Sequence, residues 1–174
     1  MRVVQTDARA KNQRLLQALG RTVLSMGDVI DVTVDLMAGA LILDSVNNRE
    51  GVPTERFPTP PNFVKGGPGL VVIDAGGRGK VHARVRIEPS APSMSDAEMA
   101  TWEETQEATF SCEDTEMFLD GSTGEVVAPF SLAIGMYRIR VHVRGRDRWF
   151  DSYTAPDGEP RIALELHIWP DPEM

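Results

Sequence analysis

The stretch that decides the fold is SLAIGMYRIRVHVRGRDRWF, residues 131–150. From residue 137 to residue 144, its side chains alternate between an apolar or aromatic type and a polar type. The first set is Tyr137, Ile139, Val141 and Val143, and the second is Arg138, Arg140, His142 and Arg144. Because successive side chains of a strand point to opposite faces, this period of two predicts a strand with one face buried and the other in water.

A tyrosine at the start of this strand indicates the kind of β-fold. Gly135 precedes Tyr137 by two residues. In the tyrosine corner of β-sandwiches, a tyrosine near the start of a strand bonds through its hydroxyl to backbone a few residues upstream. We therefore predict that Tyr137 is buried and makes such a bond.

Other segments repeat the alternation of this strand. Residues 28–36, 80–88 and 161–169 each place apolar side chains at every second position. Shorter apolar runs lie between them and are bounded by glycine-rich or proline-rich turns. Strands do not alternate with amphipathic helices, which disfavours a doubly wound α/β fold. The sequence predicts an all-β fold, an antiparallel β-sandwich of about seven to eight strands with a short N-terminal helix.

Two loops interrupt the predicted strands. Residues 45–69 are rich in proline and glycine, a composition that predicts a loop without a helix or central strand. Phe57 and Phe63 are expected to anchor this loop to the body. A second loop covers residues 145–160. Between residues 89 and 100, Ser95 and Glu98 have the spacing of a capping box and predict one short helix.

The N-terminal segment differs from the rest of the chain. Residues 7–20 read as a helix within a basic extension, residues 1–26, and residues 27–174 form the predicted β-sandwich domain. Three alternatives are open for the extension: it packs on the body, it swaps onto another subunit, or it precedes a true start at Met26.

Charge is distributed unevenly between these two parts. Residues 1–22 carry five basic residues and one acidic residue, a net charge of +4, whereas the whole chain has a net charge of −8. The remainder is therefore at −12, which argues against general nucleic-acid binding because such binding needs a basic surface. This acidic balance either serves solubility or provides a surface for a basic partner.

The compartment is inferred from cysteine content and hydropathy. Cys112 is the single cysteine, so no intramolecular disulfide forms. Its position in line with Ala108 and Phe110 predicts a buried thiol. No signal-peptide core and no membrane-spanning apolar run is present, so we expect a cytoplasmic protein without a membrane partner.

The three histidines give one candidate site. His82, His142 and His167 each occupy the polar face of a predicted strand. If those strands are neighbours, three imidazoles are able to hold zinc and leave a fourth position for water. The alternative is a solvated face of arginine, histidine and glutamate held by cross-strand charge pairs. Otherwise the sequence predicts no cofactor, and zinc is the alternative that these histidines leave open.

The arginines of the same strands give a second candidate site. A patch for phosphate or carboxylate is formed by Arg84, Arg86, Arg138, Arg140 and Arg144, unless neighbouring acidic residues neutralise it. We assign no catalytic residue. The glycine-rich turn at 74–79 lacks the residues of a phosphate loop, and no nucleophile elbow is present.

Two segments carry a resemblance to known proteins. GMYRIRV at 135–141, followed by LELHIWP at 164–170, resembles the C-terminal half of a family of mainly actinobacterial β-sandwich proteins. More remotely, the layout is similar to the competence protein J family, which inhibits a DNA-entry nuclease. That resemblance implies a β-sandwich with an acidic nuclease-binding surface, and it transfers no catalytic residue.

These observations predict a non-enzymatic protein-binding domain, of an inhibitor or immunity type. Its partner is expected to be a protein, for example a basic nuclease or toxin, and its oligomeric state is open. The alternative function is a metal-binding or anion-binding small-molecule site on the sheet face that carries the histidines and arginines.

Overall fold

Strands dominate the computed structural model, which describes residues 27–45, 52–121 and 126–172. The described elements are β1 (Val29–Leu36), β2 (Ala40–Ser45), η1 (Thr54–Arg56), β3 (Val64–Gly67), β4 (Leu70–Asp74), β5 (Arg78–Ile87), α2 (Asp96–Met99), β6 (Glu104–Cys112), β7 (Glu116–Asp120), β8 (Val126–Ser131), β9 (Gly135–Arg144), β10 (Tyr153–Thr154) and β11 (Ala163–Pro170). The extension 1–26 and its predicted helix lie outside the described residues. Within these ranges, no helix is long and apolar enough to span a membrane.

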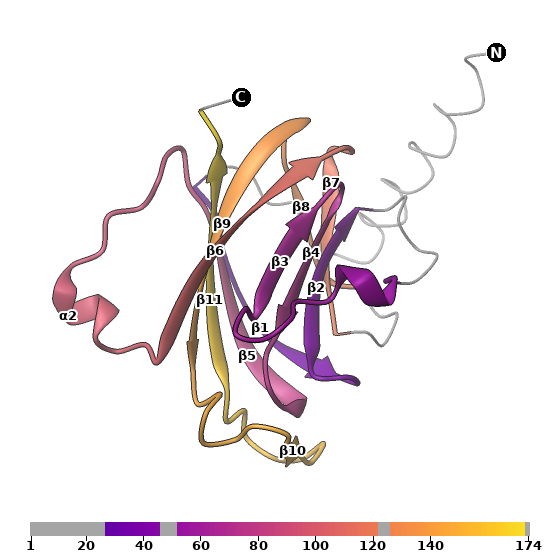
Figure 1. Cartoon of the computed structure of the whole chain (residues 1–174), viewed down its shortest axis with the longest axis vertical. Coiled ribbons are helices and arrows are strands. Elements are labelled where there is room, and N and C mark those ends of the chain that lie inside the picture. The colour runs from indigo at the N-terminus through magenta and orange to yellow at the C-terminus, as the bar shows by residue number, and fades with distance from the viewer. Residues whose placement is uncertain (1–26, 46–51, 122–125, 173–174) are drawn as a thin grey trace.

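The strands form two sheets that pack face to face (Figure 1). The first sheet has the order β1-β5-β11-β9-β6, with β10 added beside β5, and the second has the order β3-β4-β2-β7-β8. The main pairings are antiparallel, except that β11 and β10 each pair with β5 in parallel. The predicted all-β sandwich is confirmed, with two parallel pairings in its first sheet and with eleven described strands instead of about seven to eight.

The core lies between the sheets and contains the apolar sets that the alternation predicted. From β9 it receives Tyr137, Ile139, Val141 and Val143, all of which are buried. The hydroxyl of Tyr137 donates a hydrogen bond to the carbonyl oxygen of Ala133 at 2.9 Å. This bond reaches four residues upstream and confirms the predicted tyrosine corner.

A strand inside the proline-rich segment departs from the prediction. Residues 45–69 were expected to be irregular, but β3 lies within them at the edge of the second sheet. An edge strand tolerates nearby proline because one of its sides has no ladder to maintain. Gly66 lets β3 approach the first sheet, since a Cβ there would stand 2.0 Å from the carbonyl oxygen of Thr109. Gln106 adds to this junction by accepting hydrogen bonds from the backbone N–H groups of Phe63 and Val64.

Three smaller predictions agree with the structure. The hydroxyl of Ser95 accepts a hydrogen bond from the N–H of Glu98, and the Glu98 carboxylate accepts one from the N–H of Ser95, so α2 begins with a capping box. Cys112 is buried, and burial raises the pKa of its thiol to about 11. Phe63 is in the core, whereas Phe57 packs on a small cluster that includes Ile42 and Val72.

Candidate functional site

The strands that carry the predicted site residues are neighbours in the first sheet. β11 lies between β5 and β9. In register, Glu165 of β11 is paired with Arg84 of β5 on one side and with His142 of β9 on the other. Because the side-chain period of a strand is two, His82, His142 and His167 share the outer face of this sheet.

Most of the predicted anion-binding arginines are paired with carboxylates on that face. The pairs are Arg84 with Asp31, Arg86 with Glu165, Arg138 with Asp171, and Arg140 with Glu107. The hydrogen bonds from Arg84 and from His82 hold the pKa of Asp31 below its usual value. The fifth arginine, Arg144, lies over the Trp102 ring, with its guanidinium carbon 5.4 Å from the ring centroid. Anion binding by the five together stays a prediction, on a face whose charges are largely paired.

A long connection lies over the same face and contacts it near both of its ends. We call residues 88–103, which join β5 to β6 and contain α2, the strap; Figure 1 shows it arching away from the sheet. Arg140 donates a hydrogen bond to the carbonyl oxygen of Pro92 at 3.1 Å. The Trp102 ring lies 5.7 Å from the His142 ring, centroid to centroid. No residue of α2 is buried, so the strap is held by a few contacts near its ends.

Two histidines are buried beneath the strap, which corrects the expectation that this face is in water. His142 is 0% exposed and His167 is 5% exposed, and their ring centroids are 5.5 Å apart in an edge-on arrangement. The Nδ1 atom of His142 is 2.7 Å from the Thr105 hydroxyl, and its Nε2 has no partner. The ring nitrogens of His167 approach Glu88 and Glu165 at 3.5 Å, but neither approach has the geometry of a hydrogen bond.

Burial determines the protonation of this histidine pair. Removal from water, together with the nearby His167 and Arg140, lowers the pKa of His142 to about 4. Burial also lowers the pKa of His167, although the carboxylates of Glu165 and Glu88 oppose that shift. Both imidazoles are therefore neutral at pH 7, and each presents one N–H donor and one acceptor.

The three histidines do not converge on one point. His82 is two strands away from His142, because β11 separates β5 from β9, and it is bonded to Asp31. Two strand spacings amount to roughly 10 Å, which is too far for both to ligate one zinc ion at about 2 Å. The described residues contain no group of three potential ligands that is arranged for a metal. Zinc binding stays a prediction, without a preformed site in this part of the chain.

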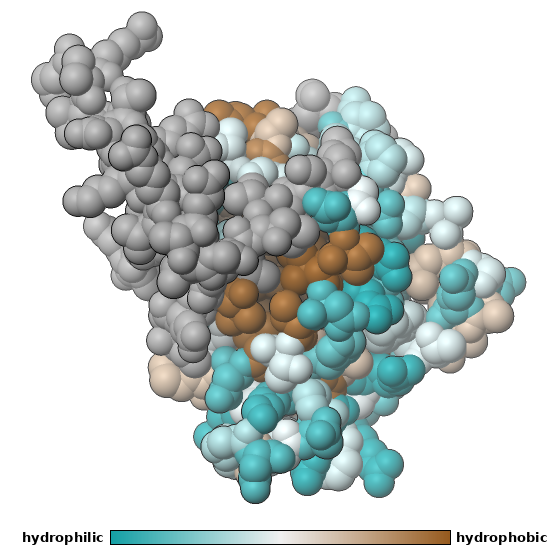
Figure 2. Space-filling view, turned by 180° about the vertical axis from the view of Figure 1, so that it is seen from behind, coloured by the Kyte–Doolittle hydropathy of each residue, from teal (hydrophilic) through white to brown (hydrophobic). Residues whose placement is uncertain are grey.

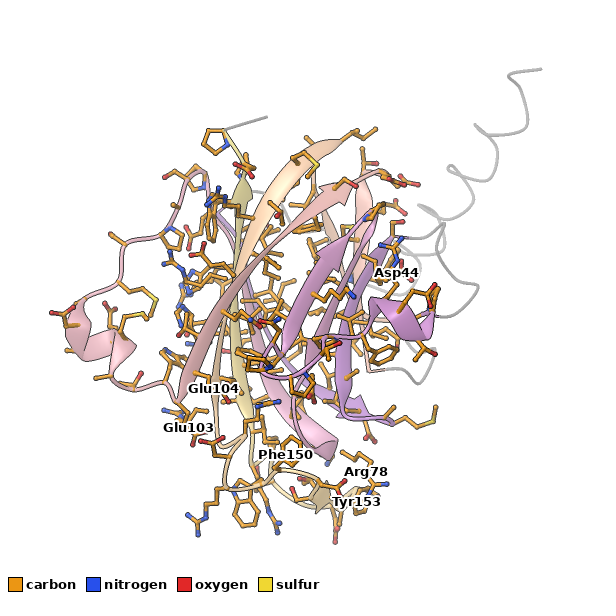
Figure 3. All side chains as sticks on the ribbon, viewed as in Figure 1. Asp44, Arg78, Glu103, Glu104, Phe150 and Tyr153 are labelled. Atoms are coloured by element: carbon orange, nitrogen blue, oxygen red, sulfur yellow. The ribbon has the colours of Figure 1, made fainter. Side chains whose placement is uncertain are left out.

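A second feature lies at one end of the sandwich. We call residues 145–162, which join β9 to β11 and include β10, the loop end. Phe150 is 60% exposed and Tyr153 is 58% exposed, and Figure 3 shows both near Arg78 at the bottom of the molecule. Seen from behind in Figure 2, the bottom of the molecule is mainly hydrophilic, and a hydrophobic area lies higher up. The aromatic side chains of the loop end therefore stand among charged residues.

Backbone contacts hold the loop end against the turn before β5. The N–H of Asp151 donates to the carbonyl oxygen of Gly76 at 2.6 Å, and the N–H of Arg78 donates to that of Ser152 at 2.9 Å. Gly79 is required beside β10, because a Cβ there would stand 2.1 Å from the carbonyl oxygen of Thr154. These bonds fix the backbone on both sides of the exposed aromatic side chains, so the surface they present is preorganised.

The sequence of residues 145–160 predicts a loop, and no function was expected of it. A signal was available, because the run Arg146-Asp147-Arg148-Trp149-Phe150 concentrates arginine and aromatic residues in a chain with only 6% aromatic residues. Arginine, tryptophan and tyrosine are the residue types most enriched at binding hot spots. The local pattern did not reveal that the loop is pinned to the turn at 74–79, since that contact joins distant parts of the chain.

Comparisons with known proteins identify the fold. No family model matches the chain, and no curated protein matches it. Among solved structures, ComJ from Bacillus subtilis, an inhibitor of the DNA-degrading activity of NucA, is similar with a TM-score of 0.55 at 9% identity, over 84% of this chain and 100% of that one. The protein of crocagin biosynthetic gene J is similar with a TM-score of 0.53 at 12% identity, over 84% of this chain and 99% of that one. This supports the remote similarity to competence protein J, while membership of an actinobacterial family stays a prediction.

Proposed function

We propose that this chain is a non-enzymatic protein-binding domain of an inhibitor or immunity type, and that its partner is an enzyme such as a nuclease or toxin. The observation that carries the proposal is the loop end, where Phe150 and Tyr153 are exposed on a backbone pinned by hydrogen bonds. Rigid, exposed aromatic side chains contribute contact area at a low entropic cost, which is the character of binding hot spots.

Two further observations support the same function. The fold is shared with ComJ, which inhibits the DNA-degrading activity of NucA, over the whole length of that protein. The net charge of −8 suits a partner of opposite charge, because a charged surface accelerates encounter with such a partner. An acidic contact surface for a basic nuclease therefore belongs to the proposal.

The test uses the full chain as bait in an extract of its source cells, followed by reconstitution. A Phe150→Ala, Tyr153→Ala variant is expected to lose a protein that the native chain retains, and the purified complex of that protein with the native chain is expected to have reduced enzymatic activity. The matched control is Val29→Ala, Ile134→Ala, since these side chains are also 47% and 70% exposed but lie at the opposite end of the first sheet.

Two results would contradict the proposal. In one, both double variants retain the same proteins as the native chain, so the loop end makes no specific contact. In the other, the partner binds stoichiometrically but its activity is unchanged at saturation. The second result would leave a binding domain that is not an inhibitor.

A second candidate function is a small-molecule site beneath the strap, and the buried Nε2 of His142, which has no hydrogen-bond partner, favours it. Buried polar atoms without partners are uncommon in native proteins, and a bound anion or metal ion is one way to satisfy them. Addition of inorganic phosphate is expected to shift the ring-proton resonances of both histidines. Stoichiometric zinc that is lost in a His142→Ala, His167→Ala variant would instead establish the metal-binding form and contradict a purely protein-binding function.

A further inference from the structure

Two arginines of the loop end share one tryptophan. The guanidinium carbon of Arg161 lies 4.3 Å from the centroid of the Trp149 ring, and that of Arg148 lies 5.1 Å from it. Trp149 itself packs against the hydrophobic core. An indole anchored in this way holds both guanidinium groups near their positions before any ligand arrives.

These two guanidinium groups differ from those on the outer face of the first sheet. There, four arginines are paired with carboxylates. In the described part of the chain, neither Arg148 nor Arg161 has a carboxylate within 4.0 Å, and both residues are exposed. A guanidinium that stacks on an aromatic ring keeps its in-plane N–H donors, which match the two oxygens of a carboxylate.

We propose that Arg148 and Arg161, held on Trp149, bind carboxylate groups of the partner protein. This inference rests on the proposed function and names the chemistry that the partner must present at the loop end. Two guanidinium groups held on one indole fit a segment with two or more aspartate or glutamate side chains. A partner with a positive net charge still carries aspartate and glutamate side chains, so a local acidic segment is compatible with the net charge of such a partner.

Phosphate groups of a nucleic acid have a related chemistry, but the surroundings favour a protein. The chain has a net charge of −8, and Asp147 and Asp151 are exposed in the same loop. A phosphate backbone is a continuous line of negative charge, so its binding needs an extended basic surface. A short acidic protein segment reaches the two arginines without crossing the rest of this surface.

The test uses a blocked tetraglutamate peptide as the probe, titrated into the full chain while the indole N–H and arginine Nε–H resonances are followed. Binding is expected to be at least about tenfold weaker in Arg148→Gln, Arg161→Gln, since charge-assisted bonds contribute more than neutral ones. Arg148→Lys, Arg161→Lys is expected to recover only part of it, because lysine has no planar fork. The control, Arg56→Gln, removes an arginine of η1, outside every candidate site, and is expected to leave binding unchanged.

A charge-reversed variant makes the result independent of any loss of folding. Arg148→Glu, Arg161→Glu is expected to lose tetraglutamate binding and to gain binding of a tetralysine peptide. Equal tetraglutamate binding by the native chain and by Arg148→Gln, Arg161→Gln would overturn the inference. It would also be overturned by a single-stranded oligonucleotide that binds these arginines more tightly than the peptide does.

Failure of this inference is distinguishable from failure of the proposed function. If the captured partner depends on Phe150 and Tyr153 but binds the Arg148→Gln, Arg161→Gln variant with native affinity, the protein-binding function stands and the carboxylate site does not. If tetraglutamate binds through these arginines but no partner depends on the aromatic pair, the carboxylate site stands and the protein-binding function does not.

Discussion

At the scale of a single residue, the hydroxyl of Tyr137 ties the start of β9 to the backbone before it. It donates to the carbonyl oxygen of Ala133 at 2.9 Å from a buried side chain. Tyr137→Phe leaves that acceptor without its donor, so we expect the free energy of unfolding to fall by about 1 kcal/mol in urea denaturation. The matched control is Tyr153→Phe, which removes the hydroxyl of an exposed tyrosine and is expected to change stability by less than about 0.5 kcal/mol. Equal effects from the two variants would contradict the role of the tyrosine corner.

The buried His142 predicts how stability depends on pH. Its pKa falls from 6.5 to about 4 on folding, mainly because of burial. Between these two values the unfolded chain binds a proton at this position and the folded chain does not. The contribution of His142 is therefore fully present above about pH 6.5 and is lost as the pH falls towards 4, to a total of roughly 3 kcal/mol. Burial lowers the pKa of His167 as well, so this residue acts in the same direction.

This pH dependence is measured by urea denaturation between about pH 4.5 and pH 7.5. We expect His142→Gln to reduce the slope of the unfolding free energy against pH. His82→Gln, which replaces the histidine bonded to Asp31, serves as the matched control and should retain the contribution of His142. A native slope in His142→Gln would show that acid destabilisation arises elsewhere.

Single residues also show where the sequence was sufficient and where it was not. Alternation alone assigned Tyr137 to the core, and the structure confirms this. The same alternation placed His142 and His167 in water, yet both are buried. A period of two identifies the face to which a side chain points, but it does not show what covers that face. Here the cover is the strap, whose path depends on contacts such as Trp102 with His142 that no local pattern contains.

At the scale of elements, the contact between β3 and β6 depends on a glycine. A Cβ at Gly66 would stand 2.0 Å from the carbonyl oxygen of Thr109, and a backbone atom cannot move aside cheaply. We expect Gly66→Ala to lower the free energy of unfolding by about 2–3 kcal/mol, because overpacking forces the two strands apart. Chemical denaturation of the full chain measures this loss.

Gly67, which follows Gly66 in the chain, offers a matched control. A Cβ at Gly67 would meet only the end of the flexible Arg56 side chain, which is able to swing away. Gly67→Ala is therefore expected to lower the unfolding free energy by less than about 1 kcal/mol. If the two variants lose the same stability, glycine is needed here for backbone freedom and not for the close approach to β6.

The contact between β3 and β6 also explains why the sequence did not predict β3. The proline and glycine content of residues 45–69 correctly disfavoured a helix and a central strand. It did not exclude an edge strand, because β3 pairs on one side only and its other side meets β6 through Gly66 and Gln106. Likewise, β10 is a two-residue strand whose pairing with β5 exists only once Gly79 brings the two backbones together.

At the scale of the whole molecule, the sheet face under the strap and the loop end differ in which side chains they leave exposed and unpaired. The strap covers the histidine pair, and most arginines of that face are paired with carboxylates. The loop end leaves aromatic side chains and two stacked arginines exposed on a fixed backbone. Composition alone left open whether the acidic balance serves solubility or a basic partner, whereas the structure adds two arginines stacked on one tryptophan at the loop end.

These two charge features predict separate effects on association with the partner. Long-range attraction between the acidic chain and a basic partner governs encounter, so the association rate is expected to fall about tenfold or more between about 50 mM and about 500 mM salt. Arg148→Gln, Arg161→Gln removes short-range contacts, so it should chiefly raise the dissociation rate and leave the salt dependence of association nearly unchanged. Stopped-flow mixing with the purified partner measures both rates. An association rate that does not respond to salt would show that the net charge of −8 serves solubility and has no part in recognition.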